Sequence, residues 1–418
     1  MAEIKPDIET FAKIKVVGVG GAGGNAVSRM IDSKIKGVEF VVINTDAQAL
    51  HNSKAAEKVH IGKNLTKGLG AGMNPEIGRQ AAEENRDEIQ EVLKGADMVF
   101  VACGLGGGTG SGAAPIVAET AKELGALTIG IVTKPFTFEG AQRRAIGEEA
   151  LSNLRDRVDS LITIPNDKLL SIIDKKTSLI NAFRIVDDVL RQGVQGISDL
   201  ITKPGIVNVD FADVRTIMED SGSALMGIGI ASGENRAEEA ARAAINSPLL
   251  ELSIDGAKGV LINISGSADL GMLEINEAAN IITESIDPNA KVIFGAVVDD
   301  QVHKGDIQIT VVATGFDAGR IRERNSVGFV SRAASVPLAP TPRAVIEPES
   351  DQPSGQEEED IFSRSAFEST RRMVEKPAMI IEEKIQPAQA PLRAETKEFV
   401  EEGDDLEIPA FIRRKMKK

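Results

Sequence analysis

A run of glycines at residues 104–112 has the composition of a site that binds an anion through its backbone. It holds six glycines together with Thr109 and Ser111. Glycines carry no side chain, so their backbone can approach a ligand closely and adopt positive φ angles. Apolar residues 98–102 predict a buried strand before the run, and residues 113–124 predict a helix after it. N–H groups that converge at the start of a helix favour phosphate, so we interpret the run as a phosphate-binding loop rather than a mobile linker.

A second glycine-rich loop follows the first predicted strand. It contains G-x-G-x-x-G at Gly18, Gly20 and Gly23 and opens a predicted helix. This order of strand, loop and helix is typical of a dinucleotide-binding fold. The next predicted strand ends beside Asp46, and an acidic residue there matches the ribose-binding position of that fold. Taken alone, the loop at 18–24 favours an NAD-dependent oxidoreductase.

The two loops together favour a nucleoside triphosphate or diphosphate over NAD. No Lys follows the 104–112 run in a G-x-x-x-x-G-K-[ST] pattern, so backbone amides and helix dipoles would hold the phosphates. One dinucleotide-binding loop leaves the second run unexplained. Two loops on neighbouring strands could embrace an extended polyphosphate from both sides.

Alternating strands and helices predict the sheet that positions these loops. The alternation indicates a mostly parallel sheet that is covered on both faces, and ligands bind at the carboxyl ends of such strands. The predicted strands are 13–19, 38–43, 98–102, 127–132 and 161–164, and the predicted helices include 76–93, 113–124 and 142–158. Polar or glycine residues follow several of these strands: Asn44, Asp46, 104–112, Thr133 and Asn166.

A long helix and a second domain are predicted beyond the sheet. Residues 178–201 carry an apolar stripe at spacings of three and four, which predicts a spine between two domains. After it we predict strands 224–231, 259–264, 291–298 and 306–313, the last two paired, and helices 236–245 and 272–286. The predicted fold class is therefore α/β: a Rossmann-like parallel-sheet nucleotide-binding domain (1–177), a central helix (178–202) and an α+β domain (203–316).

The composition changes after Phe316. Nine of the 17 prolines lie beyond residue 330, and charged and polar residues dominate there. We predict that residues 317–400 form a disordered linker. Residues 401–418 combine apolar anchors with a basic end, which is typical of a short peptide that orders when it docks on a partner.

Bulk composition excludes several function classes. The net charge of −15 and the 3% aromatic content argue against a nucleic-acid partner. The single Cys103 fits a reducing cytosol and is interpreted as a small buried filler, and the three His residues show no metal-ligand spacing. The polar N-terminus is unlike a signal peptide, and no apolar run approaches the roughly 20 residues that span a bilayer. We therefore expect a soluble, cytoplasmic protein that does not insert into membranes.

These motifs together resemble the tubulin/FtsZ family, and within it the bacterial cell-division GTPases that polymerise. The resemblance rests on five segments and covers residues 11–316 almost continuously, plus the last dozen residues. The segments are 20–25, 44–46, 107–112, 208–213 and 408–411. It implies GTP and GDP as ligands, Mg²⁺ as cofactor, and no assigned metal-ligating residue.

The resemblance assigns nucleotide-binding roles. The two glycine loops would wrap the phosphates, Glu139 and Arg143 would hold ribose and phosphate, and Asn166 and Asp187 would recognise guanine. Phe183 could stack on the base. The full set is Gly20, Gly21, Ala22, Gly23, Gly24, Asn25, Asn44, Gly107, Gly108, Thr109, Gly110, Thr133, Glu139, Arg143, Asn166, Phe183 and Asp187.

Asp210 and Asp213 stand three apart at the start of a predicted helix. From the residues alone they are an N-cap and a first-turn acid. The resemblance implies that they, with Asn208, project from one subunit into the nucleotide site of the next and orient the attacking water. Such head-to-tail contacts generate filaments, with hydrolysis dependent on assembly.

The resemblance also implies a place in the cell. The filaments would form the cytokinetic ring at the midcell division site, beneath the inner membrane. Membrane-tethering and regulatory division proteins would bind residues 406–418. Two alternatives stay open: an NAD-dependent oxidoreductase, and a scaffold in which GTP is only structural.

Overall fold

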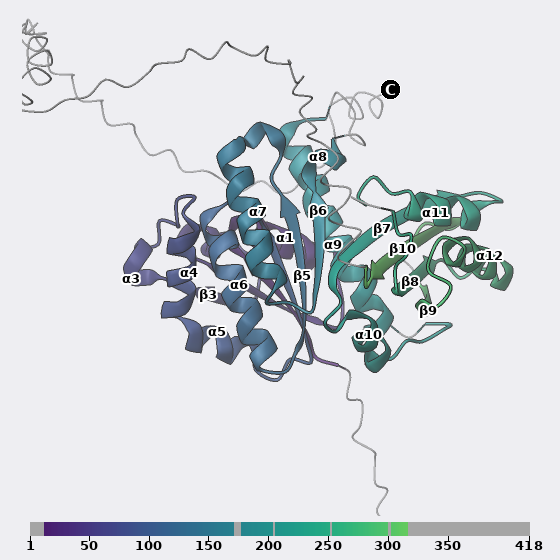
Figure 1. Cartoon of the computed structure of the whole chain (residues 1–418), viewed down its shortest axis with the longest axis horizontal. Helices are drawn as coiled ribbons and strands as arrows, with labels where there is room; N and C mark the ends of the chain where they lie inside the picture. The colour runs from purple at the N-terminus through teal and green to yellow at the C-terminus, as the bar shows by residue number, and fades with distance from the viewer. Residues whose placement is uncertain (1–11, 171–176, 204, 251–252, 300–301, 317–418) are drawn as a thin grey trace, which may run out of the picture. The chain divides into compact units, whose positions relative to one another are not determined.

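A computed structural model describes residues 12–170, 177–203, 205–250, 253–299 and 302–316. The chain divides into two units, 1–333 and 334–418, and all described residues belong to the first. Its strands form one ten-stranded sheet in the order β3-β2-β1-β4-β5-β6-β7-β10-β8-β9 (Figure 1). The predictions of a linker at 317–400 and a docking peptide at 401–418 lie outside the described residues.

The first six strands are parallel, as predicted, and their order β3-β2-β1-β4-β5-β6 is that of a dinucleotide-binding sheet. They are β1 (Ile14–Val19), β2 (Val38–Asn44), β3 (Glu57–His60), β4 (Met98–Gly104), β5 (Leu127–Lys134) and β6 (Ser160–Pro165). Strand β3 was not predicted, because it is short and has one buried residue, Val59. Parallel pairing places the carboxyl ends of these strands at one edge.

Helices cover both faces of this part of the sheet. They are α1 (Gly20–Asp32), α2 (Ala47–Asn52), α3 (Lys63–Thr66), α4 (Pro75–Glu84), α5 (Arg86–Leu93), α6 (Gly108–Glu123), η1 (Thr137–Glu139), α7 (Ala141–Arg155) and α8 (Asn166–Leu169). Strand β1 supplies Ile14 and Val16 to a core shared with α1, and Val17 and Val19 to a core shared with α4–α7. This alternation follows from the two-residue period of a strand.

Two predicted helices differ most from the observed ones, and the helices predicted at 142–158 and 272–286 end three residues earlier, at Arg155 and Thr283. Helix α6 begins at Gly108 and not at residue 113, so the loop after β4 is only Leu105–Gly107. Glycines of low helix propensity obscured this start, but they allow close packing: a Cβ at Gly112 would overlap the Pro75 carbonyl oxygen on α4. The predicted helix at 76–93 is two helices, because Asn85 leaves the helical conformation and its side chain accepts a hydrogen bond from Gly62 N at 2.8 Å.

The second part of the sheet joins the first through β7. Its elements are α9 (Leu179–Thr202), α10 (Phe211–Met218), β7 (Gly222–Ser232), α11 (Arg236–Ile245), β8 (Gly259–Gly266), α12 (Met272–Thr283), β9 (Lys291–Val298) and β10 (Asp306–Thr314). Strand β7 pairs with β6 in parallel and with β10 antiparallel. The predicted pairing of β9 with β10 is wrong: β8 lies between them, because the almost entirely buried β10 occupies the interior of the sheet.

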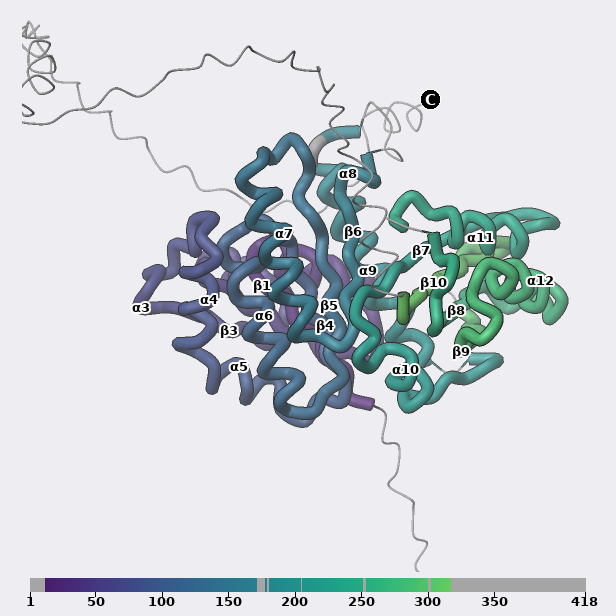
Figure 2. The backbone as a smooth tube through the Cα atoms, in the orientation of Figure 1, coloured from purple at the N-terminus to yellow at the C-terminus, as the bar shows by residue number. Residues whose placement is uncertain are grey.

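The central helix α9 lies between the two parts of the sheet in both backbone views (Figures 1 and 2). Ser178 caps its N-terminus by accepting a hydrogen bond from Asn181 N. Buried residues from Val186 to Leu200 place it in one core with β5 and the β8 residue Leu261. The predicted stripe is thus confirmed through most of its length, although Phe183 is 41% exposed. Among the described residues, no helix is long and apolar enough to cross a membrane.

Candidate functional site

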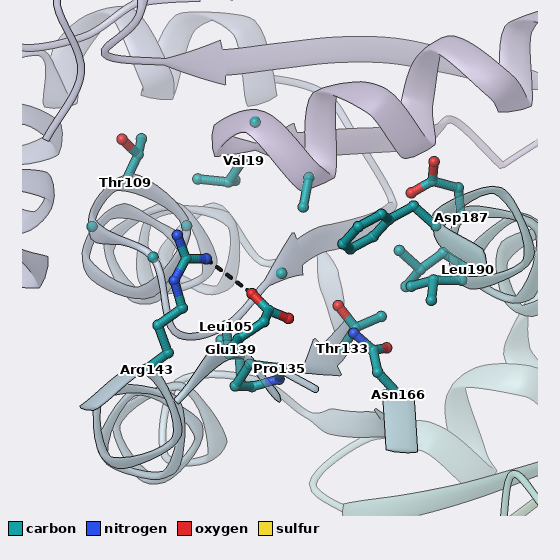
Figure 3. Close-up of a pocket in the computed structure, with 18 residues that line it drawn as sticks. Val19, Leu105, Thr109, Thr133, Pro135, Glu139, Arg143, Asn166, Asp187 and Leu190 are labelled. Carbon is teal, nitrogen blue, oxygen red and sulfur yellow. Dashed lines mark hydrogen bonds and ion pairs between the residues drawn. The ribbon is translucent and has the colours of Figure 1, made fainter. Parts of the chain in front are cut away.

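A cavity of about 330 Å³ lies at the carboxyl ends of β1, β4, β5 and β6. Figure 3 shows side chains from strands, loops and helices converging on it. Both glycine-rich loops contribute, as the sequence predicted. The lining residues are Val19, Gly21, Ala22, Gly104, Leu105, Gly107, Gly108, Thr109, Gly110, Thr133, Pro135, Glu139, Arg143, Asn166, Phe183, Val186, Asp187 and Leu190.

Three helices present bare N-termini at this cavity. Among the described helices of eight or more residues, only α1, α6 and α7 have neither a side chain bonded to a free N–H of the first turn nor an acid in that turn. Each of the three begins beside or within the lining residues. The first N–H groups of a helix lack partners inside it and carry its positive dipole end. The cavity is therefore built to attract an anion with several charges.

The glycines of the two loops have distinct structural tasks. Gly106 has φ +92°, and its N–H donates to Ser111 Oγ at 2.9 Å, which fixes the turn into α6. Gly20 has φ +73°, and a Cβ there would lie 2.9 Å from Gly110 N, so the two loops touch. By contrast, a Cβ at Gly21 or Gly107 would meet no protein atom within 4 Å. Both residues line the cavity, so their missing side chains leave room for a ligand.

Glu139 and Arg143 form an ion pair on the wall of the cavity. Arg143 donates to Glu139 Oε2 at 3.0 Å, as the dashed line in Figure 3 shows. The other carboxylate oxygen of Glu139 accepts the Phe136 N–H at 2.9 Å. These bonds fix both charged groups where a polyhydroxyl or phosphate group could reach them.

Asn166 presents an unsatisfied polar atom. Its side chain is buried, with 5% of the residue exposed, and its Oδ1 has no hydrogen-bond partner. Figure 3 shows its amide directed toward Thr133 and the interior of the cavity. A buried carbonyl oxygen without a partner costs free energy, so a ligand that donates a hydrogen bond would be stabilised here.

Asp187 supplies a partly buried carboxylate from α9. Its Oδ2 accepts a hydrogen bond from Arg29 Nε on α1 at 2.8 Å. Burial raises the pKa of Asp187 above its ordinary value, and the bond and charge of Arg29 partly oppose that shift. The second oxygen has no such bond from Arg29 and is available to a donor.

The wall beside Asp187 is apolar. Phe183, Val186 and Leu190 lie three and four residues apart along α9, which places them on one helix face, and all line the cavity. The Phe183 ring contacts Phe136 edge to face, with centroids 5.7 Å apart. An apolar wall next to a carboxylate and an amide suits a flat heterocycle with donor groups.

Asn208, Asp210 and Asp213 lie outside the cavity of their own chain. Asp210 caps α10 by accepting Asp213 N at 2.8 Å, and all three side chains are exposed. Arg215 of the same helix donates to the Gly125 carbonyl, which precedes the amino end of β5. The carboxylates are therefore at the opposite end of the strands from the cavity.

Most predicted nucleotide-binding residues line the cavity, and five do not. Gly20, Gly23 and Gly24 pack against neighbouring backbone or side chains, Asn25 is exposed on α1, and Asn44 is buried with its Oδ1 accepting Asp46 N. Sequence reasoning missed the cavity roles of Val19, Leu105, Pro135, Val186 and Leu190. Val186 lies three residues after Phe183, and Leu190 lies three residues after Asp187. This spacing indicates that the four residues lie near one another on the surface of the helix.

Metal ligands and the Cys103 thiol are the remaining candidates for chemistry among the described residues. Among the described residues, no group of three or more His, Cys, Asp or Glu side chains could hold a metal ion. Burial raises the pKa of Cys103 to about 12, so its thiol stays protonated near neutral pH. This agrees with the interpretation of Cys103 as a buried filler.

Comparisons with known proteins identify similar sequences and folds. Residues 13–174 match the Tubulin/FtsZ family, GTPase domain, and residues 222–317 match the FtsZ family, C-terminal domain. An empty FtsZ dimer from M. jannaschii is 48% identical, with a TM-score of 0.71 over 73% of this chain and 89% of that chain. A point mutant of that FtsZ is 47% identical, with a TM-score of 0.71 over 74% of this chain and 92% of that chain. CetZ2 from Haloferax volcanii, solved as a protofilament bound to GTPγS, shares the fold at 22% identity, with a TM-score of 0.62 over 74% of this chain and 98% of that chain.

Proposed function

Because the chain belongs to the Tubulin/FtsZ family, with that family's GTPase domain and the FtsZ C-terminal domain, we propose that it hydrolyses GTP at contacts between subunits of a head-to-tail filament. One observation carries this proposal. The cavity offers groups that would bind every part of a nucleotide, whereas the acids suited to orient water lie at the opposite end of the strands.

In the proposed complex the triphosphate lies against the starts of α1 and α6. Gly21 and Gly107 leave the space, and the free N–H groups there would hold the phosphate oxygens. Glu139 and Arg143 would contact ribose and phosphate. No phosphate-binding lysine is needed, because helix ends supply the positive potential.

The base would lie against Phe183 and Leu190, with Asn166 and Asp187 at its edge. Guanine carries N1–H and an exocyclic amine on one edge, and a carboxylate can accept both hydrogen bonds. Adenine offers no such pair of donors. Asn166 Oδ1, which lacks a partner, would accept a further hydrogen bond from the nucleoside.

Hydrolysis then requires a second copy. Asp210 and Asp213 of one subunit would enter the cavity of the next and orient the attacking water, while the helix ends stabilise charge on the γ-phosphate. Contact between different faces of identical chains extends into a filament. Exposed apolar side chains occur at both ends: Leu69, beside Asp46, is 86% exposed, and Ile206, beside Asn208, is 58% exposed.

Mg²⁺ fits this site only in part. When bound, it would neutralise charge on the β- and γ-phosphates. The described residues contain no cluster of acidic or imidazole ligands, so the ion would take its ligands mainly from phosphate oxygens and water.

The proposed cellular role is a cytokinetic ring at a bacterial division site. Residues 406–418 would bind membrane-tethering and regulatory division proteins. The NAD alternative rests on the loop at 18–24 and on Asp46, but it gives no role to the second glycine run, which lines the same cavity.

Sedimentation with GTP or GDP, with phosphate release measured in the same samples, tests this function. We expect polymer with GTP, little with GDP, and phosphate release that follows polymer. Nucleotide extracted from purified protein should be GDP or GTP; bound NAD would contradict the proposal. Polymer that never releases phosphate would favour a scaffold role.

A further inference from the structure

Asp167 joins two elements of the nucleotide cavity without lining it. One of its carboxylate oxygens accepts the Thr137 backbone N–H at 2.8 Å, and the other accepts the Thr137 hydroxyl. Arg144 on α7 donates to the same hydroxyl and lies 3.7 Å from Asp167. We call Thr137, Arg144 and Asp167 the clasp. It connects η1, α7 and α8.

Each side of the clasp carries cavity residues. Asn166, which precedes Asp167, holds the buried oxygen without a partner. Thr137 begins the 3₁₀ turn that ends at Glu139, the partner of Arg143. The clasp therefore sets the separation between the group that faces the base and the pair that faces the ribose.

The short helix α8 depends on such a tether. It has only four residues, and no side chain caps its N-terminus. A helix this short has little stability of its own. Burial opposes ionisation of Asp167, but the bonds from Thr137 and the charge of Arg144 outweigh it and hold the pKa of Asp167 below its usual value. The carboxylate is thus charged, and able to accept both bonds, near neutral pH.

We propose that Asp167 is a positioning residue for the nucleoside part of GTP, which it serves by holding Asn166 and the Glu139–Arg143 pair at a fixed separation. This inference rests on the proposed GTP site. The starts of α1 and α6 form most of the phosphate-binding end, and the clasp does not touch them; Arg143 is the cavity residue that links the clasp to phosphate. Loss of the clasp should therefore weaken recognition of base and ribose much more than phosphate binding.

The test compares GDP with inorganic tripolyphosphate, which has no base or sugar. Calorimetric titration of the full chain gives the affinity of each ligand. We expect Asp167→Ala to weaken GDP binding roughly tenfold, the scale of one lost charge-assisted hydrogen bond, with a clearly smaller loss of tripolyphosphate affinity. Thr137→Val, which removes the hydroxyl with little change of shape, should act in the same direction.

Two matched controls separate positioning from general damage. Thr137→Ser keeps the hydroxyl and should bind GDP like the unmodified chain. Asp87→Ala removes an exposed first-turn acid from α5, away from the cavity, and should also bind normally. Melting temperatures of all variants show whether each one folds.

The outcomes are distinct. Equal GDP affinity in the unmodified chain, Asp167→Ala and Thr137→Val would overturn the inference while leaving the proposed function intact. A parallel loss of GDP and tripolyphosphate affinity would also overturn it, because the residue would then only support the fold. If the unmodified chain binds tripolyphosphate but neither GDP nor GTP, the proposed function itself is wrong.

Discussion

Two glycines in one helix should respond oppositely to the same substitution. Gly21 and Gly23 both lie in the first turn of α1. A Cβ at Gly21 would meet no protein atom within 4 Å, whereas one at Gly23 would lie closer than 3.0 Å to the Ala102 carbonyl oxygen. Alanine is favoured over glycine in a helix by roughly 0.5–1 kcal/mol. Gly21→Ala should therefore stabilise the nucleotide-free protein, while Gly23→Ala should destabilise it.

The magnitudes follow from these distances. For Gly21→Ala we expect the melting temperature of the nucleotide-free protein to rise by roughly 1–4 °C. For Gly23→Ala, overpacking costs roughly 1–3 kcal/mol, which exceeds the gain in helix propensity and lowers the melting temperature. The methyl group at Gly21 lies where we place a phosphate, so GTP affinity should fall roughly tenfold or more, equivalent to about 1.4 kcal/mol.

Calorimetric titration with GTP and thermal denaturation without nucleotide measure the two effects separately. A Gly21→Ala protein that is more stable yet binds GTP weakly supports the assignment of this space to phosphate. If the variant binds GTP as tightly as the unmodified chain, the phosphates lie elsewhere in the cavity. If it is destabilised, protein atoms occupy the space beside Gly21.

Three further results are expected. GTP affinity should decline on acidification, and from a higher pH than an ordinary carboxylate would give, because burial raises the pKa of Asp187 and its protonated form cannot accept both guanine donors. Arg29→Gln removes the group that opposes this shift, so in binding titrations the decline should move to still higher pH. A pH-independent affinity would contradict the role of Asp187. Cys103 should resist thiol reagents near neutral pH in the folded protein, since its pKa is raised to about 12, and should react on unfolding; rapid labelling of folded protein would contradict its burial. Asp210→Asn keeps a residue that can cap α10, so the variant should fold, bind GTP and assemble. It should nevertheless release phosphate at least tenfold more slowly than the unmodified chain. Normal turnover would rule out a catalytic role for Asp210.

Local patterns predicted much of the parallel sheet and its ligand edge. Thr133 and Asn166 were placed at strand ends because buried strands are apolar runs and parallel strands share a carboxyl edge. Helix 236–245 and strand 291–298 were also predicted at their observed bounds. These features depend on residues close together in the chain.

Features that depend on distant residues could not be predicted in the same way. The start of α6 at Gly108 relies on packing against α4, which overrides the low helix propensity of glycine. The place of β10 between β7 and β8 is a choice among strand pairings that local periodicity does not encode. The bonds from Arg29 to Asp187 and from Thr137 to Asp167 likewise join segments far apart in sequence.

The division of the candidate site between two ends of the molecule is the central claim. The rate of phosphate release per subunit, measured against total protein concentration at saturating GTP, tests it most directly. If the acids at 210 and 213 complete the cavity of a neighbouring subunit, the rate per subunit should be near zero at low concentration and rise beyond a threshold as filaments form. A rate per subunit that is constant down to concentrations without polymer would show that one chain contains the whole active site.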